Sequence, residues 1–273
     1  SSGLSSVSVI CAPFQEIRFS QKFDIIFCIG VFEYSASFVA AEDPYDAALK
    51  YFSQMLTPDG IIVIAIENQF GLKYFNAFRE DHLGVSYDGL EGYHRKKEMV
   101  RTFGKNELAE IVSKYFKNVH YYYPYPDYKL PECVLSEEFL DTGLAGELVS
   151  QMKSRDYSGL VRPNWDESAA VLELTRNNML GFFSNSFLLV AGCGEIKGLS
   201  FEQLAILYSS SRKSEFSTET KITRGKDCKL LVSKRSRVGA REVDGGSLKL
   251  VDTDAAWLDT HSLQTQVTLR SMS

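Results

Sequence analysis

The sequence predicts an α/β fold built on a doubly wound sheet. Two apolar, β-branched runs, at 24–30 and 61–66, lack the alternation of half-exposed strands, which indicates strands covered on both faces. Between them, residues 44–56 carry apolar side chains at helical spacing, and Pro44 suits a first helical position. Strand, helix and strand in this order form a βαβ unit, whose two strands are expected to run parallel.

Further elements extend this alternation in both directions. Residues 7–12 are expected to form a short buried strand, and TPDG at 57–60 suits a type I turn. An apolar stripe between residues 108 and 116 predicts a helix. Gly104 and Glu107 have the spacing of a capping box at its start, with glycine in place of the usual serine.

The second half of the chain continues the pattern. A strand is expected at 118–123, a helix around 167–182, and a last strand at 186–192. The segment 200–211 that follows has a helix-like pattern of apolar residues.

Composition divides the chain into two parts. Residues 1–208 are expected to form one domain with a helical insertion at about 124–185. Residues 209–273 form a basic, partly disordered tail with a β-hairpin near Arg224. Because residues 211–241 hold ten Lys or Arg against three acidic residues, a patch for nucleic acid or acidic lipid is left open, although a solvated hairpin is favoured.

The bulk composition limits the classes of function. The formal net charge of −5 argues against a general nucleic-acid binder, since phosphate contacts are made by Lys and Arg. Five scattered cysteines without a CxxC pair argue against a zinc site or a disulfide framework, so a reducing cytoplasm is the expected location. No apolar run reaches the roughly 18 residues that a membrane span requires, and peripheral membrane contact is left open.

Two predicted strand ends carry residues suited to binding. In open α/β sheets, ligands bind at the carboxyl ends of the strands. The first strand is followed by Gly30, Val31, Phe32, Glu33 and Tyr34, and the second by Glu67, Asn68 and Gln69. Ordinary strand-to-helix loops also contain glycine and polar caps, and this alternative stays open for each loop taken alone.

At these residues the chain resembles a known family. FDIIFCIGVFEYS…YFSQMLTPDGIIVIAIEN resembles the second half of a class I S-adenosylmethionine-dependent methyltransferase. The continuation, from ENQFGLKYF to YYYPYPDYKLP, resembles the methyltransferase modules of bacterial lipopolysaccharide and O-antigen biosynthesis proteins. The resemblance covers roughly residues 7–220. It implies a Rossmann-like methyltransferase sheet, S-adenosylmethionine as cofactor, and a sugar hydroxyl or phosphate of a cell-surface polysaccharide intermediate as methyl acceptor.

The resemblance also implies roles for individual residues. The cofactor would be bordered by Cys28, Gly30, Val31 and Phe32, and the substrate by Glu33, Tyr34 and Tyr93. The catalytic candidates are Glu67, Asn68, His82 and His94. The histidines are included because histidine titrates near neutral pH, although a surface position in an insertion is an equal alternative for each. Five tyrosines within residues 121–128 offer faces that could stack on adenine or a sugar, or pack beneath the following helices.

The same resemblance implies a glycine-rich loop and an acidic ribose-binding residue ahead of residue 7, where the chain reads SSGLSS. We therefore expect an N-terminally truncated methyltransferase sheet with strand 24–30 at an exposed edge. The alternative is a non-catalytic remnant or interaction module that no longer binds cofactor. A third reading is a nucleic-acid-associated methyltransferase that uses the basic tail. Residues 219–236 resemble the start of a kinase-like module, without the motifs that kinase activity requires.

Overall fold

The computed structural model describes residues 7–13, 16–93, 100–159, 162–196, 202–209, 213, 216–225 and 230–236, and the backbone of 253–258. The strands are β1 (Phe23–Ile29), β2 (Leu56–Glu67), β3 (Asn118–Tyr125), β4 (Cys133–Ser136), β5 (Ser186–Gly192), β6 (Gln203–Tyr208), β7 (Thr218–Arg224), β8 (Leu230–Ser236) and β9 (Thr253–Leu258). The helices are α1 (Ser35–Phe38), α2 (Pro44–Met55), α3 (Leu72–Phe75), α4 (Lys105–Ser113), α5 (Glu137–Leu140), α6 (Ala145–Val149), α7 (Glu167–Arg176) and α8 (Leu180–Phe183).

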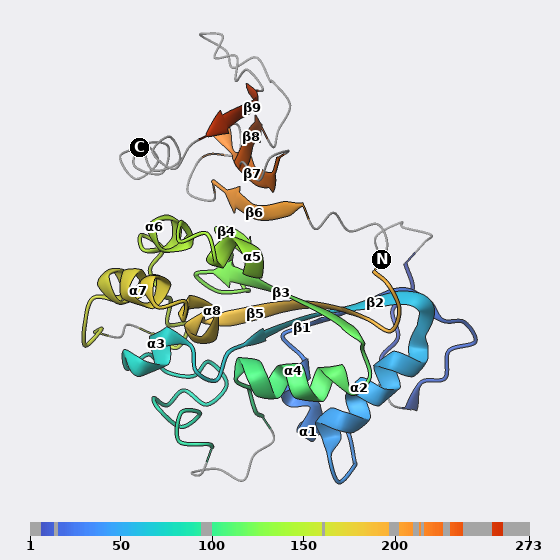
Figure 1. Ribbon diagram of the computed structural model, residues 1–273. Coiled ribbons are helices and arrows are strands. Elements are labelled where there is room, and N and C mark those ends of the chain that lie inside the picture. The colour runs from blue at the N-terminus through green and yellow to red at the C-terminus, as the bar shows by residue number, and fades with distance from the viewer. Residues whose placement is uncertain are drawn as a thin grey trace.

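The described strands form one mixed sheet in the order β1-β2-β5-β3-β4-β6-β7-β8-β9. Helices α2 and α4 lie on one side of the sheet (Figure 1). The core between these helices and the sheet contains fully buried apolar side chains from both layers, among them Leu49, Ile62, Ile64, Leu108 and Phe116. The predicted α/β class is confirmed.

The βαβ unit is also confirmed. Strands β1 and β2 run parallel, and α2 connects them. The helix begins where the sequence predicts, because Pro44 occupies its first turn and the Asp43 carboxylate accepts the backbone N–H groups of Tyr45 and Asp46 at 3.1 and 3.0 Å. The parallel pairing brings the carboxyl ends of both strands to the same edge of the sheet.

The predicted turn at 57–60 does not connect helix and strand, because β2 begins at Leu56, directly after α2. The four residues instead bulge out of the pairing with β1. Phe23 pairs with Leu56 and Ile25 with Ile61, which leaves only Asp24 opposite the bulge. Gly60 permits this close approach, since a Cβ there would lie 2.9 Å from the Phe23 carbonyl oxygen.

Strands β3 and β5 confirm the two predicted later strands. The two run in opposite directions. Strand β5 lies between β2 and β3 and runs antiparallel to both, so β2 and β3 never touch through backbone hydrogen bonds. The predicted helix before β3 is α4. Its capping box is not formed, because no side chain caps Gly104 and the Glu107 carboxylate binds Arg101 instead.

The segments after β3 differ most from the sequence predictions. The helix expected around 167–182 is split into α7 and α8, and Asn178 between them has a φ of +55°. Strand β5 is not the last strand. Residues 203–208 form β6 rather than a helix, because the free edge of β4 pairs with them and overrides their helical pattern. The hairpin predicted near Arg224 is confirmed as β7 and β8, which join the same sheet.

The strand predicted at 7–12 is not formed. These residues lie in irregular structure and are exposed, Val9 by 90%. A strand needs a partner, and none of the described strands offers one to this segment. The expected exposed edge is confirmed, since β1 pairs with β2 alone among the described strands. The expected cover on both faces is wrong for β1, because Ile25, Phe27 and Ile29 are exposed on one of its faces. In the described part of the chain, no helix has both the length and the apolar character needed to cross a membrane.

Candidate functional site

The candidate site lies where β1 and β2 end. Gly30 keeps the end of β1 attached to β2, because its N–H donates to the Ala65 carbonyl oxygen at 2.9 Å. Its φ of +64° then turns the chain into a single 3₁₀ turn at Phe32–Tyr34. A side chain at this position would collide with Tyr128, whose hydroxyl oxygen lies 2.7 Å from the place of a Cβ. Both the backbone angle and the close neighbour therefore require glycine.

Glu67, the last residue of β2, is fully buried and paired with two lysines. Its Oε1 lies 3.1 Å from Lys129 Nζ and 3.5 Å from Lys73 Nζ, and the Tyr74 hydroxyl donates to its Oε2. Burial alone would raise the pKa of the Glu67 carboxyl. The charge of Lys73 and the other groups around it outweigh burial and hold this pKa well below its usual range.

Asp81 extends this pair into a cluster. Its carboxylate binds Lys129 and lies 3.9 Å from Lys73 Nζ. Burial and the neighbouring Glu67 raise the pKa of Asp81 above its usual value. Burial alone would lower the pKa of the Lys129 ammonium. The Glu67 and Asp81 carboxylates outweigh this effect and raise that pKa above its usual value. Lys129 therefore stays charged at neutral pH.

A second acidic group, Glu33, lies in the turn that follows β1, and its contacts differ from those of Glu67. Its side chain is fully buried, and neither carboxylate oxygen has a hydrogen-bond partner among the described residues. Burial raises the pKa of Glu33 to about 7, and the negative charge of Glu67 adds to this shift. A carboxyl with a pKa near neutrality can both accept and release a proton at working pH.

His82 connects Glu33 to Tyr34. Its Nδ1 lies 2.6 Å from the Tyr34 hydroxyl, and its Nε2 lies 3.9 Å from Glu33 Oε1. Burial lowers the pKa of His82 below its usual value, which favours the neutral imidazole near pH 7. The three side chains form a row from Glu33, which is buried, to Tyr34, which is partly exposed.

Four of the residues singled out from the sequence meet at this edge: Glu33, Tyr34, Glu67 and His82. The side chains of Cys28 and Phe32 are buried in the core, whereas Val31 is exposed. Tyr93 lies apart from the cluster, where its hydroxyl contacts Thr102. His94 lies outside the described residues.

Asn68 lies next to the cluster, but its side chain is hydrogen-bonded to backbone groups. Its Nδ2 donates to the carbonyl oxygens of Phe182 and Ser184, each at 2.7 Å, and its Oδ1 accepts from the N–H of Phe70 at 3.0 Å. Asn68 therefore joins the end of β2 to the segment that enters β5.

Sequence reasoning missed Lys73 and Lys129. It included Tyr128 only as one of the five tyrosines at 121–128, without a place at the strand ends. Three of these five tyrosines, Tyr121, Tyr123 and Tyr125, are buried in the core, and only Tyr128 reaches the strand ends. Lys129 follows it directly. Lys73 stands in an apolar helix, where a lysine requires a buried acidic partner.

The loop that presents Tyr128 and Lys129 is held at its base by Asp127. The Asp127 Oδ1 accepts the N–H groups of Lys129 and Leu130 at 3.0 and 3.1 Å, and both carboxylate oxygens accept from the Tyr157 hydroxyl. These contacts set the direction in which the two side chains leave the loop.

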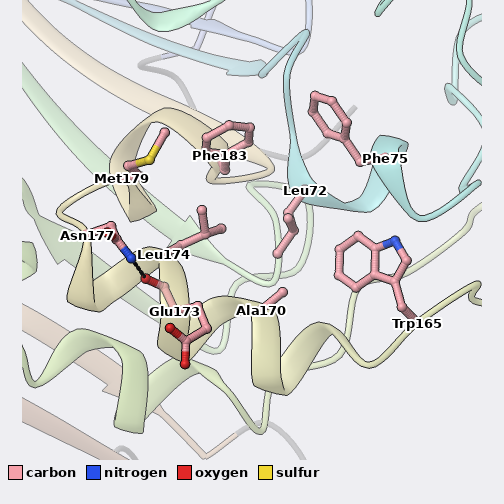
Figure 2. A pocket seen from close by; sticks show the side chains of 9 residues that line it. All are labelled: Leu72, Phe75, Trp165, Ala170, Glu173, Leu174, Asn177, Met179 and Phe183. Atoms are coloured by element: carbon pink, nitrogen blue, oxygen red, sulfur yellow. Dashed lines mark hydrogen bonds between the residues drawn. The ribbon is translucent and has the colours of Figure 1, made fainter.

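A separate cleft of about 370 Å³ lies between α3, α7 and α8 (Figure 2). Its lining is apolar apart from Glu173 and Asn177: Leu72, Phe75, Trp165, Ala170, Leu174, Met179 and Phe183. It has no set of interacting acids and bases, so we place the chemistry at the strand ends. Within the described residues, no group of three or more His, Cys, Asp or Glu could hold a metal ion.

Comparison with known proteins gives little further guidance. No protein-family model and no curated protein matches the chain. Among solved structures, PKMT2 from Rickettsia typhi in complex with AdoHcy matches with a TM-score of 0.29 and 12% identity, over 68% of this chain and 38% of that one. A second PKMT2 structure matches with a TM-score of 0.30 and 12% identity, over 79% and 47%. The chain thus spans less than half the length of these proteins, and likeness at this level assigns it no function.

Replacing Asn68 tests the junction after β2. In Asn68→Ala, two carbonyl oxygens and one N–H lose their buried partner, so we expect the free energy of unfolding to fall by about 3 kcal/mol. Urea denaturation measures this loss. Asn177→Ala is the control, because its exposed amide donates to a single carbonyl oxygen. A loss no larger than that of the control would contradict the structural role of Asn68.

Replacing Glu33 tests its buried charge through pH. The pKa of Glu33 rises from an ordinary 4.5 to about 7 on folding, so its contribution to stability is fully present below pH 4.5 and is lost as the pH rises through 7. Glu33→Gln carries no charge, so we expect it to match the wild type at pH 4.5 and to exceed it at pH 8 by up to about 3 kcal/mol. Urea unfolding across this range measures the difference.

Glu173→Gln serves as the matched control for this experiment, since the Glu173 carboxylate is exposed on α7. It should show no comparable pH-dependent gain. A stability difference between Glu33→Gln and the wild type that is the same at both pH values would show that Glu33 is not buried as a charge.

Proposed function

We propose that the strand-end site transfers a methyl group from S-adenosylmethionine to a hydroxyl group of a saccharide, with a cell-surface polysaccharide intermediate as the acceptor. The observation that supports this most is the row Glu33–His82–Tyr34 at the carboxyl ends of two parallel strands. It combines a buried carboxylate that has no hydrogen bond from the described residues, a neutral imidazole and a partly exposed hydroxyl. The saccharide and its cell-surface origin rest on the resemblance of the sequence.

The residues present fit the charged end of this cofactor. Its sulfonium and ammonium groups are cationic, and three buried carboxylate oxygens here lack a hydrogen-bond partner in the described part of the chain: both oxygens of Glu33 and Oδ1 of Asp81. Glu33 would hold the cationic end, with the backbone of Gly30 and Val31 beside it. When bound, the cofactor supplies a methyl group that is already activated by the positive sulfur. The fit concerns this end of the cofactor alone.

The protein's own contribution is the movement of a proton. A hydroxyl acceptor must lose its proton as it becomes a nucleophile. Tyr34 accepts that proton while its own passes to Nδ1 of His82, 2.6 Å away. Burial lowers the pKa of His82 and keeps its ring neutral. In the tautomer that carries its proton on Nε2, Nδ1 is free to receive the proton from Tyr34, and the resulting imidazolium faces Glu33 through Nε2. This follows the general pattern of a base that is oriented by a third group.

The charge of the site favours a hydroxyl over a phosphate acceptor. A phosphate needs no base, so the row would have no task. It would also enter beside Glu33, Glu67 and Asp81, while the two lysines nearby are already engaged by Glu67 and Asp81. Like charges at short range disfavour such binding.

The second candidate is a methyltransferase-like module that binds no cofactor. The closure of the site favours it, since Glu33 and Glu67 are fully buried and the Tyr128 hydroxyl covers Gly30. The two candidates differ in a simple observable, because only the first binds S-adenosylhomocysteine, the product of the cofactor.

The proton row gives the decisive test. Tyr34→Phe keeps the ring but removes the hydroxyl, so we expect methyl transfer to a neutral saccharide to fall by about 10²- to 10⁴-fold. Binding of S-adenosylhomocysteine should stay within about twofold, because Tyr34 does not hold the cofactor in this scheme. Transfer of a labelled methyl group measures the first quantity, and isothermal titration the second.

Tyr115→Phe is the matched control, since the Tyr115 hydroxyl binds Asp46 away from the strand ends. An unchanged rate in Tyr34→Phe would refute the proton row. A folded wild-type chain that does not bind S-adenosylhomocysteine would refute the proposed function and favour the cofactor-free module.

A further inference from the structure

We propose that Tyr128 is a positioning residue whose ring face, with Glu33, receives the positively charged sulfur of the methyl donor. The site thereby distinguishes S-adenosylmethionine from its neutral product. This inference rests on the proposed function and adds to it a residue and a selectivity for charge.

The position of the Tyr128 ring is the first support. Its hydroxyl oxygen lies 2.7 Å, and two of its ring carbons 3.4 Å, from the place of a Cβ on Gly30. The ring therefore lies against the exit of β1, the strand end at which a ligand of an open α/β sheet binds. Any residue other than glycine at this exit would displace the ring.

The ring is also held in place from its own loop. The Tyr128 N–H donates to Ser186 Oγ at 3.3 Å, and Asn185 Nδ2 donates to the Pro126 carbonyl oxygen at 3.0 Å. Together with the turn at Asp127, these bonds fix the loop to the start of β5. A ring that is oriented before binding loses little entropy when the ligand arrives.

The surroundings of the ring suit a cation. Burial and the nearby carboxylates of Glu33, Glu67 and Asp81 raise the pKa of Tyr128 far above its usual value, so the phenol stays neutral in a negative region. One cation already lies near this ring, because Lys129 Nζ is 5.7 Å from its centroid. That ammonium is held by Glu67 and Asp81, whereas the Glu33 carboxylate has neither a hydrogen bond nor a lysine or arginine partner among the described residues.

A sulfonium matches the two groups that remain available, the Tyr128 ring and the Glu33 carboxylate. It carries a permanent positive charge but has no proton to donate, so it cannot be held by hydrogen bonds. The face of an aromatic ring and an ionised carboxylate are the groups that attract such a cation. The sulfur of the thioether product has no charge and loses both attractions, which favours release of the product after transfer.

Isothermal titration of both ligands into the full chain tests the inference. We expect Tyr128→Leu to weaken the binding of S-adenosylmethionine about tenfold and to leave that of S-adenosylhomocysteine within about twofold. Tyr128→Phe keeps the ring face and should keep the wild-type preference. Tyr122→Leu is the control, because it removes a half-buried tyrosine from β3 rather than from the strand-end loop.

The possible results separate the two proposals. Equal losses for both ligands in Tyr128→Leu would mean a merely structural role and overturn the inference, while the proposed function would stand. A folded wild type that binds neither ligand would overturn the proposed function, and the inference with it.

A second measurement does not depend on the folding of Tyr128→Leu. In wild-type protein with ¹³C-labelled tyrosine, the Tyr128 resonance is identified as the one missing from Tyr128→Phe. Trimethylsulfonium should shift this resonance, and neutral dimethyl sulfide should not. A resonance that responds to neither, or equally to both, would overturn the inference.

Discussion

The buried carboxylate of Glu67 and its two lysines are the interaction on which the strand ends depend. A buried carboxylate without a countercharge costs several kcal/mol, so the end of β2 is stable only when Lys73 and Lys129 reach it together. Lys73 comes from α3, just after β2, whereas Lys129 comes from the loop after β3. Asp81 completes the charge balance on the second lysine. One ionic cluster thus fixes three segments around the site.

Glu33 and Glu67 show how the surroundings give two identical side chains different pKa values. Both stand at the end of a parallel strand and both are fully buried. Glu67 has ammonium partners and remains ionised, while Glu33 has none among the described residues and titrates near neutrality. Neighbouring carboxyls whose pKa values are pushed apart take different roles, one as a fixed charge and the other as a group that exchanges protons. The separation follows from the partners and not from the depth of burial.

The sequence predicted what depends on local pattern. The βαβ unit and the binding residues after each of its strands follow from periodicity and strand ends, and the structure brings Glu33, Tyr34, Glu67 and His82 together. The failures concern pairing between distant segments. A strand at 7–12 lacks a neighbour, β6 exists because β4 offers an edge, and Lys129 reaches Glu67 across 62 positions of chain. No local pattern in a single sequence contains such contacts.

The place of β5 has a consequence for how this chain folds. Since β5 separates β2 from β3, each of these two strands has an open edge until residues 186–192 have left the ribosome. The sheet cannot grow strand by strand during synthesis, and its centre closes with a contact that spans more than 120 residues between Ile61 and Gly192. Pairing of this kind has a high contact order, which slows folding and prolongs the exposure of apolar edges. The nascent protein therefore exposes the apolar edges of β2 and β3 until its last central strand is inserted.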